Sequence, residues 1–263
     1  MDHIIENLSQ ELHVRPEHAQ AVVALLDEGN TVPFIARYRK EQHGTMDDQT
    51  IRTLADRLQY LRGLDQRKAE VIAAVAAQEK LTPELEAAVN AAATLTEVED
   101  LYRPYRPKRK TRASVARDRG LEPLAQAVWT GKDPEGRALT LAGLEAMAKT
   151  FVDEEKGVAT LEEALQGAGD IIAEDFSDDA ARRKVLRENI NRKGDLRCAA
   201  NTEEDTVYST YYDFQSPLRR LQGHQILAMD RGEREGALKV SVLPGDFGPV
   251  GMILQGVALG HPF

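Results

Sequence analysis

Residues 47–76, DDQTIRTLADRLQYLRGLDQRKAEVIAAVA, decide the class of fold, because their apolar side chains recur at the spacing of a long helix. Large aliphatic residues stand three or four positions apart from Ile51 to Leu64, and further ones follow up to residue 75. They are Ile51, Leu54, Leu58, Leu61, Leu64, Val71, Ile72 and Val75. This spacing places them on one face of an α-helix, which a globular protein buries against other elements. The stretch therefore predicts one long amphipathic helix opened by Asp47-Asp48.

The segments on both sides of this stretch carry further helix signals. Apolar stripes predict helices over residues 2–13, from residue 16 to Gly29-Asn30, and over about 33–42, where Phe34, Ile35 and Tyr38 are expected to be buried together. Downstream, three more helix starts are predicted from capping patterns, at Thr96 with Glu99, at Thr160 with Glu163, and at Ser177 or Asp178. We therefore expect a helical assembly over residues 1–194.

The pattern changes after residue 195. The helical periodicity fades there, and LKVSV at 238–242 alternates in the manner of a short strand. Residues 243–263, LPGDFGPVGMILQGVALGHPF, contain a single charged residue and form an atypical apolar tail for which no structure is predicted. The predicted fold class is mainly α, with a helical region 1–194, a small mixed α/β region 195–242 and the tail.

The composition is that of an ordinary globular protein with an acidic balance. The chain has 263 residues, 42% of them hydrophobic and 29% charged, with a formal net charge of −9. An acidic chain repels nucleic acid over most of its surface, so we expect contact with nucleic acid only at a local basic patch. Cys198 is the sole cysteine, no cationic leader precedes an apolar run, and no apolar stretch reaches the ~18 residues that span a membrane. We therefore expect a reduced, soluble, cytoplasmic protein with no membrane partner.

Basic residues are concentrated in one window, RPYRPKRKTRASVARDR at 103–119. The window holds eight of the 34 basic side chains and one of the 43 acidic ones, so the remainder of the chain has a net charge of −16. Pro104 and Pro107 exclude an uninterrupted helix and favour the polyproline conformation, which has three residues per turn. In that conformation, one edge would carry Arg103, Arg106, Arg109 and Arg112, and another Tyr102, Tyr105 and Lys108.

This window is the main candidate for contact with nucleic acid, with cations on phosphates and tyrosine rings stacked on bases. The candidate residues are Tyr102, Arg103, Tyr105, Arg106, Lys108, Arg109, Lys110, Arg112 and Arg117. A second candidate group points away from the apolar face of the helix expected at 33–42, and it comprises Arg37, Arg39 and Lys40. In the competing interpretation, the tyrosines pack on helices and the arginines pair with acidic side chains. The residues alone leave both interpretations open.

The chain carries no sequence motif of an enzyme. It lacks the phosphate-binding GxxxxGK[ST], the zinc-binding HExxH and the nucleophile-bearing GxSxG. Its six histidines are scattered singly, and Cys198 has no neighbouring base in the sequence. We therefore predict that the protein is not an enzyme and has no catalytic residue, metal, cofactor or small-molecule substrate.

Four stretches closely resemble the N-terminal region of the Tex family of bacterial transcription accessory proteins. They are TVPFIARYRKE (31–41), VEDLYRPYRPKRKTRASVARDRGLEPLA (98–125), EEKGVATLEEALQGAGDIIAED (154–175) and SPLRRLQGHQILAMDRGEREGALKV (216–240). The resemblance covers residues 1 to about 242 and implies a helical region with a helix-turn-helix-like unit. In the family, an RNase-H-like (YqgF-type) domain, helix-hairpin-helix motifs and an OB-fold RNA-binding domain follow.

The resemblance also implies a function. The chain stops where the RNase-H-like domain is expected to begin, which an early stop, a frameshift or a deliberate fragment would produce. The expected function is that of a nucleic-acid-binding transcription accessory protein, with RNA or DNA as a partner together with RNA polymerase or other transcription proteins. The alternative is a helical scaffold that binds proteins of the transcription machinery and makes no nucleic-acid contact of its own.

Overall fold

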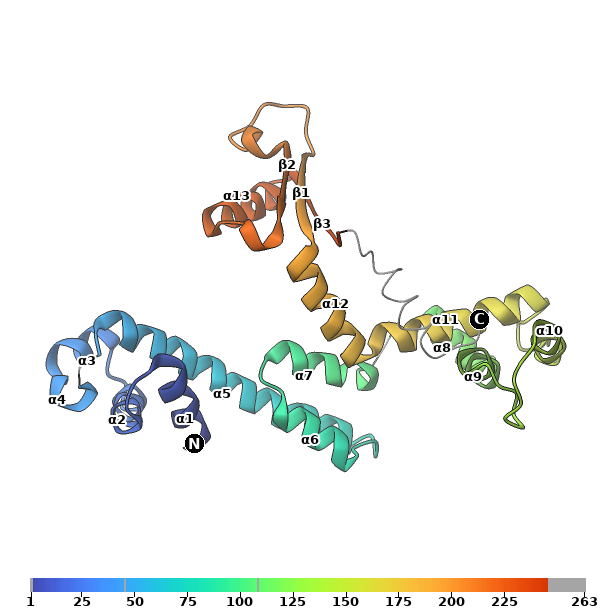
Figure 1. Ribbon diagram of the computed structural model, residues 1–263, viewed down its shortest axis with the longest axis horizontal. Helices are drawn as coiled ribbons and strands as arrows, with labels where there is room; N and C mark the ends of the chain where they lie inside the picture. The colour runs from blue at the N-terminus through green and yellow to red at the C-terminus, as the bar shows by residue number, and fades with distance from the viewer. Residues whose placement is uncertain (1, 45, 108, 246–263) are drawn as a thin grey trace. The chain divides into compact units, whose positions relative to one another are not determined.

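The protein is represented by a computed structural model that describes residues 2–44, 46–107 and 109–245 (Figure 1). Helices dominate this part of the chain, and the strands in it form one small antiparallel sheet, so the predicted mainly α class is confirmed. The chain divides into two compact units, Met1–Tyr102 and Arg103–Phe263. Lys108 and residues 246–263 of the predicted apolar tail lie outside the described residues.

The first unit is built entirely of helices in its described residues. They are α1 (Asp2–Leu12), α2 (Pro16–Asp27), α3 (Val32–Tyr38), α4 (Lys40–His43), α5 (Asp48–Ala76), α6 (Pro83–Ala91) and α7 (Leu95–Tyr102). Helices α1 to α4 gather along the N-terminal half of α5, and α6 and α7 lie along its C-terminal half (Figure 1). The helix predicted from the opening stretch of sequence is therefore the central element of the unit.

Helix α5 confirms the predicted apolar stripe. Every aliphatic residue of that stripe is buried except Ile72, which is half-buried. The Asp47 carboxylate caps the helix by accepting a hydrogen bond from the Thr50 N–H at 2.7 Å. Burial of each large aliphatic side chain contributes about 1.5–3 kcal/mol, so this one face supplies much of the stability of the unit.

Two details of the first unit differ from the sequence prediction. The helix expected over 33–42 is interrupted at Arg39, whose backbone angles (φ −127°, ψ 33°) separate α3 from α4, and Tyr38 is 57% exposed rather than buried. The N-cap predicted at Thr96 is instead Thr94, whose hydroxyl accepts from the Glu97 N–H at 3.2 Å. Both threonines precede a glutamate by three residues, and the hydrogen bond from the Leu95 N–H to the Tyr60 hydroxyl fits a helix that starts at Leu95.

The second unit begins with a 3₁₀ turn at Arg103–Tyr105 and continues with α8 (Arg112–Asp118), α9 (Glu122–Thr130), α10 (Leu141–Lys149) and α11 (Leu161–Asp178). Helix α11 contacts the three other helices, and its Ile171 is fully buried in the core they share. The predicted cap at Thr160 is confirmed, since its hydroxyl accepts from the Glu163 N–H at 3.2 Å. The approach of α8 and α9 to α11 is close, because a Cβ on Gly167 would lie 2.3 Å from Leu121 Cδ1.

Helix α12 (Ala180–Lys193) follows α11 and leads to the sheet. Its N-cap is Asp179, whose carboxylate accepts from the Arg182 N–H at 2.7 Å, so the predicted cap at Ser177 or Asp178 is wrong by one or two residues. Helix α11 extends through Asp178, which leaves Asp179 as the first residue with extended backbone.

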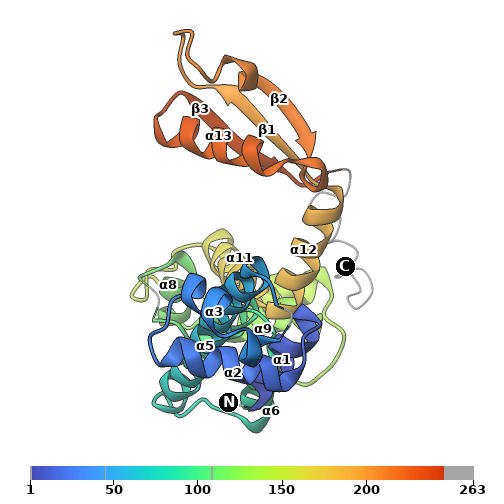
Figure 2. The same cartoon turned by 90° about the vertical axis from the view of Figure 1, so that its left-hand side faces the viewer.

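The sheet has the strand order β2-β1-β3, with β1 (Asp195–Ala200) paired antiparallel to β2 (Asp213–Pro217) and to β3 (Leu238–Leu243). Helix α13 (Gly223–Arg234) lies along the sheet (Figure 2). Cys198, Met229 and Leu238 are buried in the small core that forms between them. The strand predicted at 238–242 is confirmed, whereas the three-part domain division and the helix-turn-helix-like unit stay predictions.

In the described residues, no helix combines the length and the apolar character that crossing a membrane requires.

A pair of glycine substitutions tests the description of the first unit. Gly44 has φ +65°, and a Cβ there would lie 2.7 Å from His18 Nε2, so Gly44→Ala should lower the free energy of unfolding by about 1–3 kcal/mol. Gly63 lies within α5 with open space around it, so Gly63→Ala should raise that free energy by about 0.5–1 kcal/mol. Urea unfolding followed by circular dichroism measures both, and equal effects would contradict the structure.

Candidate nucleic-acid interface

The basic window has a mixed backbone rather than one continuous conformation. Arg103 lies in the 3₁₀ turn, and Arg112 is the first residue of α8. The predicted polyproline edge of four arginines is therefore wrong at both of its ends. The helix starts at residue 112 because Thr111 and Ser114 form a reciprocal cap, in which each side-chain oxygen accepts the other residue's N–H, at 3.0 and 2.9 Å. The sequence carried this signal, and it was missed.

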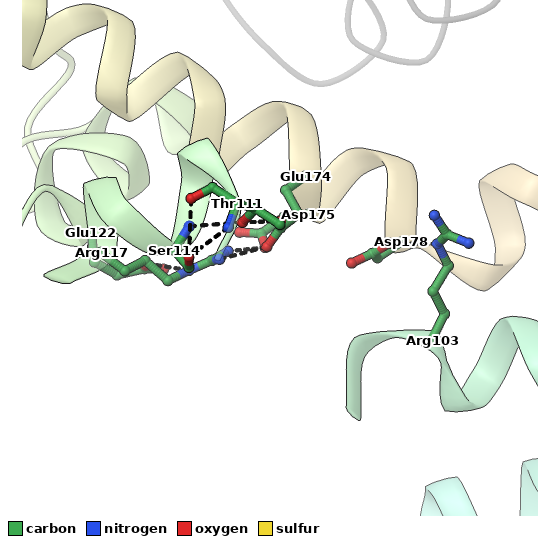
Figure 3. Close-up of polar contacts among 8 residues, drawn as sticks. All are labelled: Arg103, Thr111, Ser114, Arg117, Glu122, Glu174, Asp175 and Asp178. Carbon is green, nitrogen blue, oxygen red and sulfur yellow. Dashed lines mark hydrogen bonds and ion pairs between the residues drawn. The ribbon is translucent and has the colours of Figure 1, made fainter. Parts of the chain in front are cut away.

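Arg117 is held by three carboxylates (Figure 3). Its guanidinium donates to Glu174 at 2.7 Å, to Asp175 at 2.5 Å and to Glu122 at 3.0 Å. Burial lowers the pKa of Arg117, but the hydrogen bond to Glu174 and the three negative charges outweigh burial and raise this pKa above its ordinary value. Arg117 thus fastens α8 to α11 and to the start of α9.

Arg103 is also held by a carboxylate from α11. Its Nε donates to Asp178 at 2.7 Å, and the side chain of Asp178 is only 8% exposed (Figure 3). Tyr102, Tyr105 and Arg106 have interactions as well, and the ring of Tyr102, in the first unit, lies 5.4 Å from the guanidinium of Arg67. These side chains therefore make contacts within the protein itself.

The remaining described candidates of the window face solvent. Arg109 and Lys110 are exposed, and the side chain of Arg112 is 86% exposed with its Nε 3.8 Å from the carboxylate of Asp170. Lys110 and Arg112 border a hollow of about 700 Å³ that is also lined by Arg119, Glu163 and Asp170. Apart from Arg106, which has interactions of its own, the described candidate cations of the window form a held pair, Arg103 and Arg117, and an exposed trio, Arg109, Lys110 and Arg112.

The second basic group lies around the break between α3 and α4. The guanidinium of Arg39 lies 5.1 Å from the centroid of the Phe34 ring and donates to the Tyr38 carbonyl at 3.2 Å. Arg37 and Lys40 are exposed and line a different hollow, of about 740 Å³. Arg39 therefore contacts its own chain neighbours, whereas Arg37 and Lys40 line the hollow.

Clustered metal-binding side chains and the thiol of Cys198 are the groups that could support metal binding or catalysis. Among the described residues, no group of three or more His, Cys, Asp and Glu side chains is arranged to hold a metal ion. Cys198 is buried, and this burial, followed by the charge of Glu233, raises the pKa of its thiol. A raised pKa keeps the thiol protonated and poorly nucleophilic at neutral pH.

Two family models match the chain, Tex-like protein N-terminal domain over residues 2–76 and Tex central region-like over residues 142–248. A Bacillus subtilis protein named YdcI is 44% identical over 243 residues, which cover 91% of this chain and 33% of that protein. The transcriptional accessory protein Tex of Neisseria gonorrhoeae is 40% identical over 238 residues, 89% of this chain and 30% of the relative. The human S1 RNA-binding domain-containing protein 1 is 26% identical over 250 residues, 91% of this chain and 24% of the relative. The chain thus spans about a third or less of the length of these relatives.

The division of the basic window predicts that two matched substitutions differ strongly in their effect on stability. Arg117→Gln removes a cation from among three carboxylates, and we expect it to lower the free energy of unfolding by about 1–3 kcal/mol. Arg109→Gln makes the same chemical change at an exposed position and should alter that free energy by less than about 0.5 kcal/mol. Thermal or urea unfolding compares them, and a neutral Arg117→Gln would show that the ionic contacts of Arg117 do not stabilise the unit.

Proposed function

The chain belongs to the Tex family, and we propose that it acts in transcription, in the cytoplasm, as a non-enzymatic accessory protein that contacts RNA or DNA. One curated relative is named a transcriptional accessory protein and another an S1 RNA-binding domain-containing protein. Both names support a role connected with nucleic acid. The chain spans only part of these relatives, so the contact proposed here concerns its own residues.

The observation that carries the proposal is the exposure of Arg109, Lys110 and Arg112 on an otherwise acidic chain. Three cations lie within four residues, and the contact of Arg112 with Asp170 is long at 3.8 Å. A phosphate can displace such a contact at small cost, because an exposed ion pair contributes only about 0–1 kcal/mol. The trio can therefore attract a phosphate backbone at the cost of only this one long contact.

The held pair supports this contact by fixing the elements on either side of the trio. Arg103 joins the 3₁₀ turn to Asp178 of α11, and Arg117 joins α8 to the same helix. The segment that bears the trio is thus attached at both ends to one rigid element. Attachment reduces the conformational entropy that binding would otherwise cost.

The proposal includes the remaining candidates of the window, Arg106 and Lys108, as further phosphate contacts, and Tyr102 and Tyr105 as rings that stack on unpaired bases. Stacking suits RNA or single-stranded DNA, because every base offers a flat face to a tyrosine ring. Cations on such a segment attract phosphates without reading base edges, so we expect binding with little preference for sequence.

A second candidate function is that of a scaffold that binds RNA polymerase or another transcription protein. The observation that favours it is the exposure of helices α12 and α13. None of the 14 residues of α12 is buried, and Ile226 and Leu227 of α13 are 49% and 70% exposed. Exposed aliphatic side chains on helices are typical of protein contacts. The two functions are compatible, because they use different parts of the second unit.

The nucleic-acid contact is tested with the triple variant Arg109→Gln, Lys110→Gln, Arg112→Gln. Binding to a single-stranded RNA and to duplex DNA is measured by fluorescence anisotropy over a series of salt concentrations. The slope of log K against log salt is negative, and each phosphate contact that is lost should reduce its magnitude by about 0.9 on duplex and about 0.7 on a single strand. The fold should remain intact because all three side chains are exposed.

The matched control neutralises three exposed lysines elsewhere in the same unit, at Lys132, Lys149 and Lys239. It changes the net charge by the same amount, so it corrects for the general attraction between the chain and a polyanion. The proposal requires that the magnitude of this slope, relative to the wild-type chain, fall more in the first triple variant than in the control. Equal slopes in the two variants would assign any binding to overall charge and leave the scaffold function as the better account.

A further inference from the structure

A hollow of about 740 Å³ lies in the first unit where α3, α4 and the start of α5 meet. Its lining brings together three cationic side chains, Arg37 from α3, Lys40 from α4 and Arg52 from α5. The last residue of α4, His43, also lines it. These residues converge from three successive helices, so the hollow is formed by the turn of the chain between α3 and α5.

His43 is the unusual member of the lining. It is only 2% exposed, and within the described residues neither of its ring nitrogens has a hydrogen-bond partner. A buried polar group without a partner is costly, and native proteins rarely leave one in that state. A neutral imidazole has one N–H donor and one acceptor nitrogen, so the His43 ring keeps both groups for a further partner.

The charges around the hollow favour an anion. Two acidic residues also line it, so three cations stand against two carboxylates; Asp48 pairs with Arg52 at 3.3 Å, and the charged Asp47 carboxylate accepts from the Thr50 N–H at 2.7 Å. By contrast, Arg37 and Lys40 have no ion pair within the part of the chain that the structure describes, and Arg37 only approaches the Tyr38 ring at 6.0 Å. The positive charge of these two side chains is therefore available to a ligand.

We propose that this hollow binds a phosphate group. The guanidinium of Arg37 and the ammonium of Lys40 donate to its oxygens, and the N–H of His43 donates to another. A tetrahedral oxyanion offers oxygens in several directions and so suits donors that converge from different helices, and arginine and lysine are the side chains that most often hold phosphate. The proposal concerns the first unit alone and does not rest on the contact proposed for the basic window.

Inorganic phosphate is the probe for the test. The full chain is titrated with phosphate at constant ionic strength, with sodium chloride as the reference salt, while the ring signals of His43 are followed by NMR. We expect saturable shifts of those signals. Arg37→Gln and Lys40→Gln should each weaken the apparent affinity at least about fivefold, since each removes one charge-assisted hydrogen bond. Arg15→Gln, which neutralises an exposed arginine of the same unit outside the hollow, should leave the affinity unchanged.

A second arm distinguishes the two sources of such a phosphate. A short single-stranded oligonucleotide is compared with and without a 5′-phosphate on the wild-type chain and on Lys40→Gln. Tighter binding of the phosphorylated form, lost in the variant, assigns the site to a nucleic-acid end. Equal binding of both forms, together with saturable shifts by inorganic phosphate, assigns it to a free phosphate or a small phosphorylated molecule. His43 signals that do not respond to phosphate, or shifts that Arg37→Gln and Lys40→Gln leave unchanged, would overturn the proposal and leave ordered water as the partner of the imidazole.

Discussion

The arrangement of the basic window depends on one ionic cluster, in which the guanidinium of Arg117 lies among the carboxylates of Glu122, Glu174 and Asp175. The Thr111 hydroxyl, which also caps α8, donates to Glu174 at 2.9 Å. One set of contacts therefore fixes where α8 begins and how it attaches to α11.

The ion pairs on this side of α11 bear on where a phosphate backbone approaches under the proposed function. Arg103 and Arg117 are engaged with Asp178, Glu174 and Asp175 of α11. The proposed contact with phosphate therefore falls on the exposed trio Arg109, Lys110 and Arg112. Cations of one window thus have two roles, and the partner of each side chain decides which role it has. The held pair maintains the structure, and the trio is available for binding.

Local patterns in the sequence were sufficient to predict the helices but not the site. The stripe from Ile51 to Val75 and the cap at Thr160 depend on residues close together in the chain, and both were confirmed. One error arose where two threonines offer the same capping pattern, as at the start of α7. Another arose where burial depends on how the helices pack, as for the exposed Tyr38. The carboxylate partners of Arg117 on α11 lie 57 and 58 residues away in sequence.

The same limit applies to the individual side chains of the candidate sites. Nothing in the sequence distinguishes Arg117 from Arg109, because both are arginines in one basic run and only long-range contacts separate them. His43 is likewise one of six scattered histidines until the fold buries it beside Arg37 and Lys40. Pairing with the distant carboxylates of α11 distinguishes Arg117, and burial distinguishes His43. Sequence spacing does not encode either property.

Lysine footprinting tests the central claim most directly, because it reports on single side chains in the unmodified protein. The chain is acetylated with and without saturating single-stranded RNA, and the reactivity of each lysine is read by mass spectrometry. The account predicts that RNA protects Lys110 while Lys132 and Lys149, which are also exposed and lie in the same unit, keep their reactivity. Unchanged reactivity of Lys110, or equal protection of all three lysines, would contradict it.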